Sequence, residues 1–504
     1  MLGAITQLLP GPFTAPSIDW LALGPEVVLL VLFVVLILLD AVKLDRAKAA
    51  MPAVANLGFL IALVPLIALA AEGGDRILFD GSYVVDSMSL ILKAMFIVAA
   101  YVVVLLSTNY VAEGDYWESE YYTLLACSVL GMVVMASSRD LVGIFVALEL
   151  LSIPAYMLAG WRKGDSQSNE AGMKYYLMGV FASAVLLYGM SLIYGVGGST
   201  RLDVIALRLT DIGSEGVPVV TLAILFTLIG FAFKVSAVPF HVWAPDTYEG
   251  APTPVTAFLA VASKAAGFVA LIQIVYFCFI VRPDVIQPVF FVLSVLSMTV
   301  GNLIALRQTN VVRMLAYSGI AQAGFMLAPF VVADELPVQS RQAVVIYLVI
   351  YAAMNLGAFA VVIAVARKTR SAEIDSFGGL FTYMPAMAVA LTMFLASLIG
   401  IPPLGGWYAK FGVFSVLIEA ETPLGLVTAI VMAVNTAIAA YYYLKVAKAM
   451  WFDDAPDGDV APVAVPASLT AAVVLSLVVT FVLGILPGLI TDVTEYGPIA
   501  IGGR

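Results

Sequence analysis

Residues 217–240 read VPVVTLAILFTLIGFAFKVSAVPF, and this stretch decides the fold. It is long and apolar enough to cross the hydrocarbon core of a bilayer, which takes about 20 residues of helix. Lys234 places a charge deep inside it. Pro239 removes a backbone donor and clashes with the preceding turn, which breaks a helix. The segment therefore predicts a membrane span with an ionisable group at depth and a break beside it.

Comparable apolar runs recur from about Val27 to about Ile490, so almost the whole chain is expected to lie in the membrane. Of its 504 residues, 62% are hydrophobic and 12% are charged, whereas an average soluble domain is roughly 25% charged. This composition excludes an ordinary soluble fold. The net charge of -10 lies mostly in hydrophilic loops such as 113–120 and 453–459, and we interpret it as solvated loop charge.

The apolar runs and their interruptions predict an all-α membrane protein with about fourteen transmembrane helices. The expected spans are 22–42, 52–71, 87–107, 119–137, 141–161, 171–195, 217–240, 253–281, 285–305, 311–333, 341–366, 377–420, 425–450 and 464–490. With the N-terminus outside, the inner loops hold twelve of the 24 Lys and Arg residues, and the outer loops and tail hold seven. Because Lys and Arg concentrate on the inner side, we predict that both termini lie outside.

Two spans are expected to be broken, the seventh at Pro239 and the twelfth at Pro402 and Pro403. Each break is followed by a tryptophan at the same distance, Trp243 after Pro239 and Trp407 after Pro403. A second echo relates residues 156–160 (YMLAG) to residues 325–329 (FMLAP). These echoes predict two five-span repeats, 119–281 and 285–450, preceded by a three-span segment, 1–118, and followed by a loop and last span, 451–504. Five is odd, so successive repeats must be inverted, as in many transporters.

One acid and several lysines fall inside the predicted spans. A charge at mid-bilayer costs ~2.5–3.5 kcal/mol on insertion scales, so such residues are usually functional. Glu149 lies near the middle of the fifth span, and Lys174 lies near the inner end of the sixth. Because these two spans are joined by a short loop and should be antiparallel, we expect that Glu149 and Lys174 can approach each other as an ion pair.

Lys234 and Lys264 lie deep in the seventh and eighth spans, and Lys410 follows the second break by seven residues. A low-dielectric site lowers the pKa of a lysine and a nearby carboxylate raises it, so its proton affinity can be switched. We therefore predict a proton path from Glu149 through Lys234 and Lys264 to Lys410, along the plane of the membrane.

His241, the only histidine, follows Pro239 by two residues. Neutral imidazole can pass a proton between its nitrogens, which makes His241 a candidate link between Lys234 and Lys264; it is equally a residue that caps a helix end. Further candidates for holding bridging waters are hydroxyl residues that are just as well explained by close helix packing: Ser152, Ser236, Thr253, Ser263 and Ser318.

The remaining intramembrane lysine, Lys93, lies about six residues into the third span, where its amine can reach the interface along its stem. We expect it to do so and assign it no role. Cys127 and Cys278 lack metal-ligand spacing and are expected to pack as small hydrophobes. No nucleotide loop, metal cluster or catalytic nucleophile is recognisable, so catalytic residues, bound cofactors and metals are not expected in this chain.

The run FHVWAPDTYEGAPTPVTAFLAVASKAAGF, Phe240 to Phe268, resembles the signature of the subunit N family of proton-translocating NADH-quinone oxidoreductase, respiratory complex I. The resemblance extends to Glu149, Lys174, the helix of Lys234, and Gly405-Gly406-Trp407 leading to Lys410. Related antiporter-like subunits typically carry leucine-proline-aspartate and a later histidine where this chain has Ala244-Pro245-Asp246 and Lys264.

The resemblance implies a fourteen-helix antiporter-like module in the bacterial cell membrane, surrounded by lipid and by other membrane and peripheral subunits, including neighbouring antiporter-like ones. It implies no nucleic acid. Other subunits would carry electrons from NADH through FMN and iron-sulfur clusters to quinone, and this chain would move protons as part of that translocating enzyme. It also implies that Glu149, Lys174, Lys234, Lys264 and Lys410 are proton-path residues. Two alternatives stay open: a subunit of a cation/proton antiporter without a redox partner, and a structural membrane scaffold.

Overall fold

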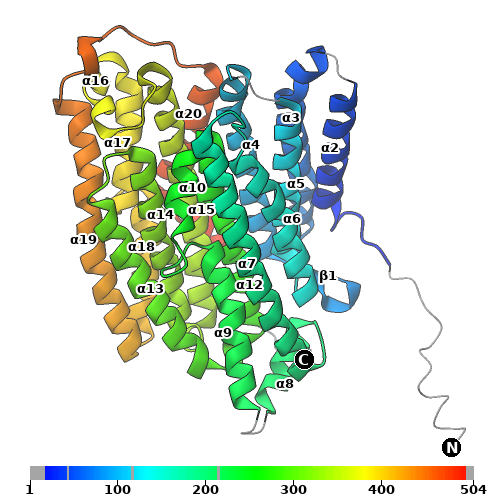
Figure 1. Ribbon diagram of the computed structural model, residues 1–504. Coiled ribbons are helices and arrows are strands. Elements are labelled where there is room, and N and C mark those ends of the chain that lie inside the picture. The colour runs from blue at the N-terminus through cyan, green and yellow to red at the C-terminus, as the bar shows by residue number, and fades with distance from the viewer. Residues whose placement is uncertain (1–16, 43–44, 115–117, 213–215, 495–504) are drawn as a thin grey trace, which may run out of the picture.

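The computed structural model describes residues 17–42, 45–114, 118–212 and 216–494 as a tall helical bundle (Figure 1). Within these residues, thirteen helices are long and apolar enough to cross a membrane. The predicted twelfth span is instead two shorter helices, α17 (Pro385–Ile399) and α18 (Gly405–Glu419), separated at Pro402 and Pro403. The all-α membrane fold and its two interrupted spans are confirmed.

The N-terminal part consists of three helices, α2 (Gly24–Ala41), α3 (Asp45–Glu72) and α4 (Ser87–Ala112). The loop before α4 contains a short antiparallel hairpin, β1 (Arg76–Leu78) and β2 (Tyr83–Val85), which the sequence patterns did not predict. Asp86 caps α4, because its side chain accepts a hydrogen bond from the backbone of Ser89 while the Ser89 hydroxyl bonds the backbone of Asp86.

The next group of helices runs from α5 to α12 and surrounds the first break. Its members are α5 (Glu118–Ser137), α6 (Leu141–Ala159), α7 (Ser166–Gly197), α8 (Leu202–Thr210), α9 (Val217–Lys234), α10 (Trp243–Gly250), α11 (Thr253–Phe258), a π-helical turn (Leu259–Ser263) and α12 (Lys264–Phe277). The continuous span formed by α11, the π-helical turn and α12 is entirely buried in its most apolar window. It therefore forms the centre of the bundle.

The second group contains the second break and continues to the end of the described chain. Its helices are α13 (Pro283–Ala305), α14 (Val311–Leu327), α15 (Pro337–Thr369), α16 (Leu380–Tyr383), α17, α18, α19 (Pro423–Phe452), α20 (Ala467–Ile485) and α21 (Gly488–Thr491). Helices α14 and α15 are almost entirely buried, whereas α19 and α20 expose most of their surface. Figure 1 shows α19 and α2 on opposite flanks of the bundle.

Helices α6 and α14 begin in the same way. The side chain of Asp140 accepts hydrogen bonds from the backbone of Val142 and Gly143, and that of Asn310 accepts them from Val312 and Arg313. Both caps also form isolated bridges, Asp140 with Arg201 and Asn310 with Glu373. These shared features agree with the predicted repeat, but the inverted relation and the boundaries 119–281 and 285–450 stay predictions.

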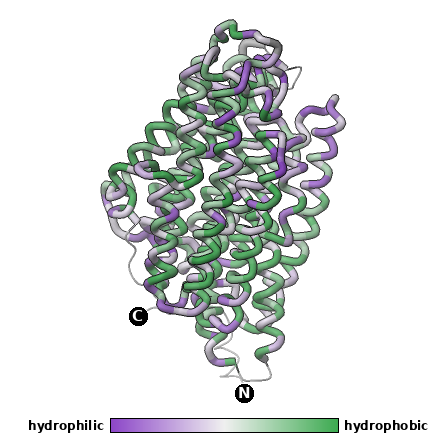
Figure 2. The backbone as a smooth tube through the Cα atoms, turned by 90° about the vertical axis from the view of Figure 1, so that its left-hand side faces the viewer, coloured by the Kyte–Doolittle hydropathy of each residue, from purple (hydrophilic) through white to green (hydrophobic). Residues whose placement is uncertain are grey.

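Hydrophobic residues cover the length of the helices, and hydrophilic residues gather towards the two ends of the bundle (Figure 2). We name the end that carries the loop 160–165 and α10 the inner end, following the distribution of Lys and Arg. The end that carries β1, β2 and α8 is the outer end (Figure 1). The side to which each end faces stays a prediction.

Candidate functional site: a row of buried lysines

Lys234 is the last residue of α9, directly before the first break. Its amine donates to the hydroxyl of Ser152 on α6 at 2.8 Å and to that of Tyr175 on α7 at 3.3 Å. The side chain is 4% exposed and lies beside the rings of Tyr156 and Tyr175. A buried cation thus has neutral hydroxyl partners, each of which can accept or donate a hydrogen bond.

Glu149 lies one turn before Ser152 on α6. It is half-buried, and its carboxylate accepts a hydrogen bond of 2.6 Å from Ser183 on α7. A cavity of about 10 Å³ is lined by Ser183, Ser152 and Lys234, and a single water needs roughly this volume. The carboxylate also interacts electrostatically with Lys234. The cavity therefore lies between Lys234 and Ser183, the hydrogen-bond partner of Glu149.

The expected ion pair between Glu149 and Lys174 is wrong. The amine of Lys174 binds Asp246 at 2.8 Å and Glu170 at 2.7 Å. The reason is helix register: Ser183, the partner of Glu149, lies nine residues beyond Lys174 on α7, which is roughly 13 Å of helix rise. Lys174 lies instead at the inner end and is half-exposed.

Lys264 directly follows the π-helical turn Leu259–Ser263. Such turns occur frequently at functional sites. The amine of Lys264 donates to the backbone carbonyl of Gly319 on α14 at 2.8 Å, and the side chain is 1% exposed. The Ser263 side chain interacts with the Tyr175 hydroxyl. Tyr175 therefore contacts Lys234 directly and the residue before Lys264.

Polar side chains fill the space between Lys264 and the second break. On α14 and α15, Tyr347 donates to the side chain of Gln322, and Asn355 donates to Tyr351 at 2.9 Å. Gln322 also donates to the carbonyl of Leu398, at the end of α17, at 3.1 Å. A further hydrogen bond joins Ser318 to Tyr443 on α19.

Lys410 completes the row. Its amine donates to the carbonyl of Ile399 at 3.0 Å, next to the Leu398 carbonyl that accepts from Gln322. It also lies 4.4 Å from the centroid of the Phe325 ring, which is a cation–π distance. The side chain is 7% exposed. Buried polar groups therefore connect the surroundings of Lys264 to those of Lys410.

His241 is half-buried in the loop between α9 and α10, and its ring bonds the backbone of Pro239. Among the described residues, no hydrogen bond joins His241 to Lys234 or Lys264. The role of His241 as a link between these lysines stays a prediction. Both breaks contain cis peptide bonds, Val238-Pro239 and Pro402-Pro403.

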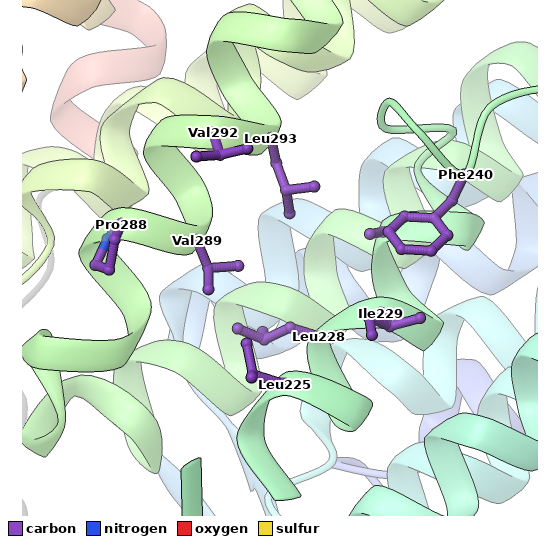
Figure 3. Close-up of a pocket in the computed structure, with 9 residues that line it drawn as sticks. Leu225, Leu228, Ile229, Phe240, Pro288, Val289, Val292 and Leu293 are labelled. Carbon is purple, nitrogen blue, oxygen red and sulfur yellow. The ribbon is translucent and has the colours of Figure 1, made fainter. Parts of the chain in front are cut away.

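An apolar pocket of about 320 Å³ lies beside the first break, between α9 and α13. Figure 3 shows Leu228 and Ile229 of α9, Val289 and Val292 of α13, and Phe240 of the loop around it. All of its lining residues are apolar. The pocket is therefore chemically distinct from the polar row.

Lys93 does not reach the interface, so that prediction is wrong. It is fully buried, and its amine binds the carboxylate of Glu26 at 2.7 Å. The Tyr83 hydroxyl donates to the same carboxylate at 2.6 Å. The partner that keeps the amine inside the protein lies on α2, two spans earlier in the sequence.

Within the described residues, no group of three or more His, Cys, Asp or Glu side chains is arranged to hold a metal ion. Several polar residues that lie beside or between the three buried lysines were not predicted from the sequence: Tyr175, Gln322, Tyr347, Tyr351, Asn355 and Tyr443. A tyrosine in an apolar helix resembles any core aromatic. A sequence feature that could have indicated these residues is the presence of tyrosines at 175, 347, 351, 442 and 443 in the spans that flank the lysines.

Comparison with known proteins places the chain in a family. The family model described as NADH:quinone oxidoreductase/Mrp antiporter, TM matches residues 138–436, which contain Glu149 and all three lysines of the row. NADH-quinone oxidoreductase subunit N of Heliobacterium modesticaldum is 42% identical over 416 residues, which cover 82% of this chain and 85% of that protein.

Solved structures show the same relationship. A chain of respiratory complex I from Thermus thermophilus is 32% identical, with a TM-score of 0.76, over 95% of this chain and 100% of that one. A chain of the Mrp complex from Dietzia sp. shares the fold, with 19% identity and a TM-score of 0.81 over 95% of this chain and 97% of that one. The chain therefore belongs to the NADH:quinone oxidoreductase/Mrp antiporter family of multi-pass membrane proteins, among relatives named subunit N.

Proposed function

We propose that this chain moves protons across the membrane as a subunit of a proton-translocating NADH:quinone oxidoreductase. The observation that carries the proposal is the row of Lys234, Lys264 and Lys410, three buried amines whose direct partners are neutral oxygens. No carboxylate within 4 Å fixes their charge in the described structure. Each amine can therefore bind or release a proton when its surroundings change.

The path begins at Glu149 and follows the contacts of the row. Ser183 binds Glu149 and Ser152 binds Lys234, and the cavity of about 10 Å³ that both serines line has room for one water between them. Tyr175 and Ser263 lead on towards Lys264. From Lys264, the polar side chains of α14 and α15 lead to Lys410. Lys174 lies at the inner end, where protons would enter.

The relatives named NADH-quinone oxidoreductase subunit N support the proposed setting. In this setting, other subunits hold NADH, FMN, iron-sulfur clusters and quinone, and electron transfer there drives proton movement here. The partners are other membrane and peripheral subunits of complex I, including neighbouring antiporter-like subunits. The bacterial relatives favour the bacterial cell membrane. The distribution of Lys and Arg favours both termini outside.

The decisive variant is Lys234→Ala in the assembled complex. Proton translocation per NADH oxidised should lose the share carried by this subunit, because the first amine of the row is gone. The control is Lys163→Ala, which removes an exposed lysine from the inner-end loop. NADH oxidation and the subunit content of the purified complex report on assembly. Unchanged stoichiometry in an intact Lys234→Ala complex would refute the proposal.

A second candidate function is a cation/proton antiporter subunit, which is favoured by the shared fold of the Mrp complex chain. The two functions differ in their partners. Affinity purification from native membranes should recover flavin- and iron-sulfur-containing subunits if the first proposal is correct. Recovery of antiporter subunits alone, with sodium-dependent proton movement in liposomes, would favour the second.

A further inference from the structure

Helix α10 lies at the inner end, between α7 and α14, and one carboxylate ties it to both. The Oδ2 atom of Asp246 binds the amine of Lys174 on α7 at 2.8 Å. The Oδ1 atom of the same residue binds the guanidinium of Arg313 on α14 at 3.0 Å. Because α7 and α14 belong to different predicted repeats, this three-residue bridge connects the two halves of the molecule at α10.

The same helix also contacts the surroundings of Lys234. Trp243, the first residue of α10, stacks on Tyr175 with a centroid distance of 4.5 Å and an interplanar angle of 9°. Its indole nitrogen donates to the carbonyl of Phe233, the residue before Lys234, at 3.1 Å. Tyr175 is itself a hydrogen-bond partner of the Lys234 amine. One short helix therefore carries both the ionic bridge and the ring that supports a partner of Lys234.

Helix α10 is also closely packed on α7. A methyl group at Gly250 would lie 2.5 Å from the carbonyl oxygen of Gln167 and 2.9 Å from the side chain of Ala171. Only a glycine permits this approach of the two backbones. Since α10 has eight residues, roughly 12 Å of helix, a displacement at Asp246 is transmitted directly to Trp243.

We propose that Asp246 is a positioning residue for Lys234: by binding Lys174 and Arg313, it holds α10 so that Trp243 keeps Tyr175 within reach of the Lys234 amine. This inference rests on the proposed function, because it assigns Lys234 a proton. Asp246 itself touches no residue of the row. Loss of its charge breaks the contact of Asp246 with Lys174 on α7 and with Arg313 on α14, and the support that Trp243 gives to Tyr175 is weakened.

The charged groups around Asp246 show that the bridge does not act as a pH sensor near neutrality. They are Glu170 and Lys174 on α7, Glu249 on α10 and Arg313 on α14, which together line a polar pocket of about 180 Å³. Burial raises the pKa of Asp246, but hydrogen bonds from Lys174 and Arg313 outweigh it and hold the pKa below its ordinary value. Asp246 therefore stays ionised throughout the range in which pumping is measured.

The test compares Asp246→Asn with Glu249→Gln in the assembled complex. Both variants neutralise one carboxylate of α10 in the same pocket, but Glu249 binds only Arg313, at 2.6 Å. Proton translocation per NADH oxidised is measured from pH 6 to pH 8. Asp246→Asn should lower it roughly threefold to tenfold, the effect of weakening one hydrogen-bond partner, and should shift its pH profile. Glu249→Gln should retain the wild-type profile, and Asp246→Glu should restore it in part.

A wild-type profile in Asp246→Asn, or an equal loss in Glu249→Gln, would overturn the inference. Arg313→Met provides a second measurement if Asp246→Asn does not assemble, because it removes the α14 partner of Asp246 and lies outside the proposed proton path: a shifted profile supports the inference, and an unchanged one contradicts it. Lys234→Ala in the same series separates the two proposals. If Lys234→Ala pumps normally, the proposed function fails; if only Asp246→Asn pumps normally, the function stands and the positioning role fails.

Discussion

Two regions of this protein bury lysines, and they hold them differently. In the N-terminal helices, Lys93 is fully buried against the carboxylate of Glu26 at 2.7 Å. In the central row, Lys234 donates to hydroxyls, and Lys264 and Lys410 donate to backbone carbonyls. A carboxylate at ion-pair distance stabilises the charged amine and fixes its protonation state. Neutral oxygens leave that state open, so under the proposed function the partner, more than burial, distinguishes a structural lysine from a proton carrier.

The largest effect is expected from Lys264→Met. Removing a group that gives and takes protons typically lowers the rate of a proton-transfer step ~10²–10⁴-fold. Proton translocation by this subunit should therefore be almost abolished. Thermal stability should not fall, because methionine fills a similar volume without a buried amine. Proton translocation per NADH in membrane vesicles and the melting temperature of the purified complex measure the two effects. A large loss of stability with normal translocation would place Lys264 beside Lys93 as a structural residue.

Lys93→Met should show the opposite pattern. Breaking a buried ion pair costs about 3–5 kcal/mol, because the remaining carboxylate is buried without its partner. Hydrogen exchange in α2 and α4 should therefore accelerate, while translocation per NADH in the assembled complex stays normal. The double variant Lys93→Met with Glu26→Gln should recover most of the stability, since no unpaired charge remains. Lost translocation in a stable double variant would show that the pair carries protons.

These two kinds of lysine look alike in the sequence. Apolar run lengths and prolines predicted thirteen of the spans and both breaks, because those signals are local. Depth along a span correctly indicated that Lys234, Lys264 and Lys410 are buried. The partners of the lysines could not be predicted. Glu26 lies two spans before Lys93 in the sequence. Lys174 binds Asp246 only because of the way α7, α10 and α14 pack together. The π-helical turn before Lys264 has no sequence signature either.

A smaller effect is expected from Gly319→Ala, which changes only the surroundings of Lys264. The added methyl group would lie 2.9 Å from the Lys264 amine and 3.1 Å from the Tyr351 hydroxyl, so the flexible amine must move. Weakening its hydrogen bond to the carbonyl of Gly319 should lower translocation roughly threefold to tenfold, since one hydrogen bond contributes about 0.5–1.5 kcal/mol. Alanine favours the helix over glycine by roughly 0.5–1 kcal/mol, so stability should not fall. Unchanged translocation would show that the position of this amine is not critical.

The smallest effect concerns Lys174, which resembles Lys93 because carboxylates hold it. Its partner Asp246 has a lowered pKa, so the bridge contributes stability above the ordinary aspartate pKa, about 3.9, and loses it only as the pH falls through the lowered value. The difference in melting temperature between the wild type and Asp246→Asn should therefore be constant from pH 6 to pH 8 and should shrink only in acid. Across the same neutral range, translocation depends on amines that change protonation, so its pH profile should vary. A change near pH 7 in the difference in melting temperature would show that the bridge between Asp246 and Lys174 titrates there. Lys174 would then not have the fixed charge that we assign to lysines held by carboxylates.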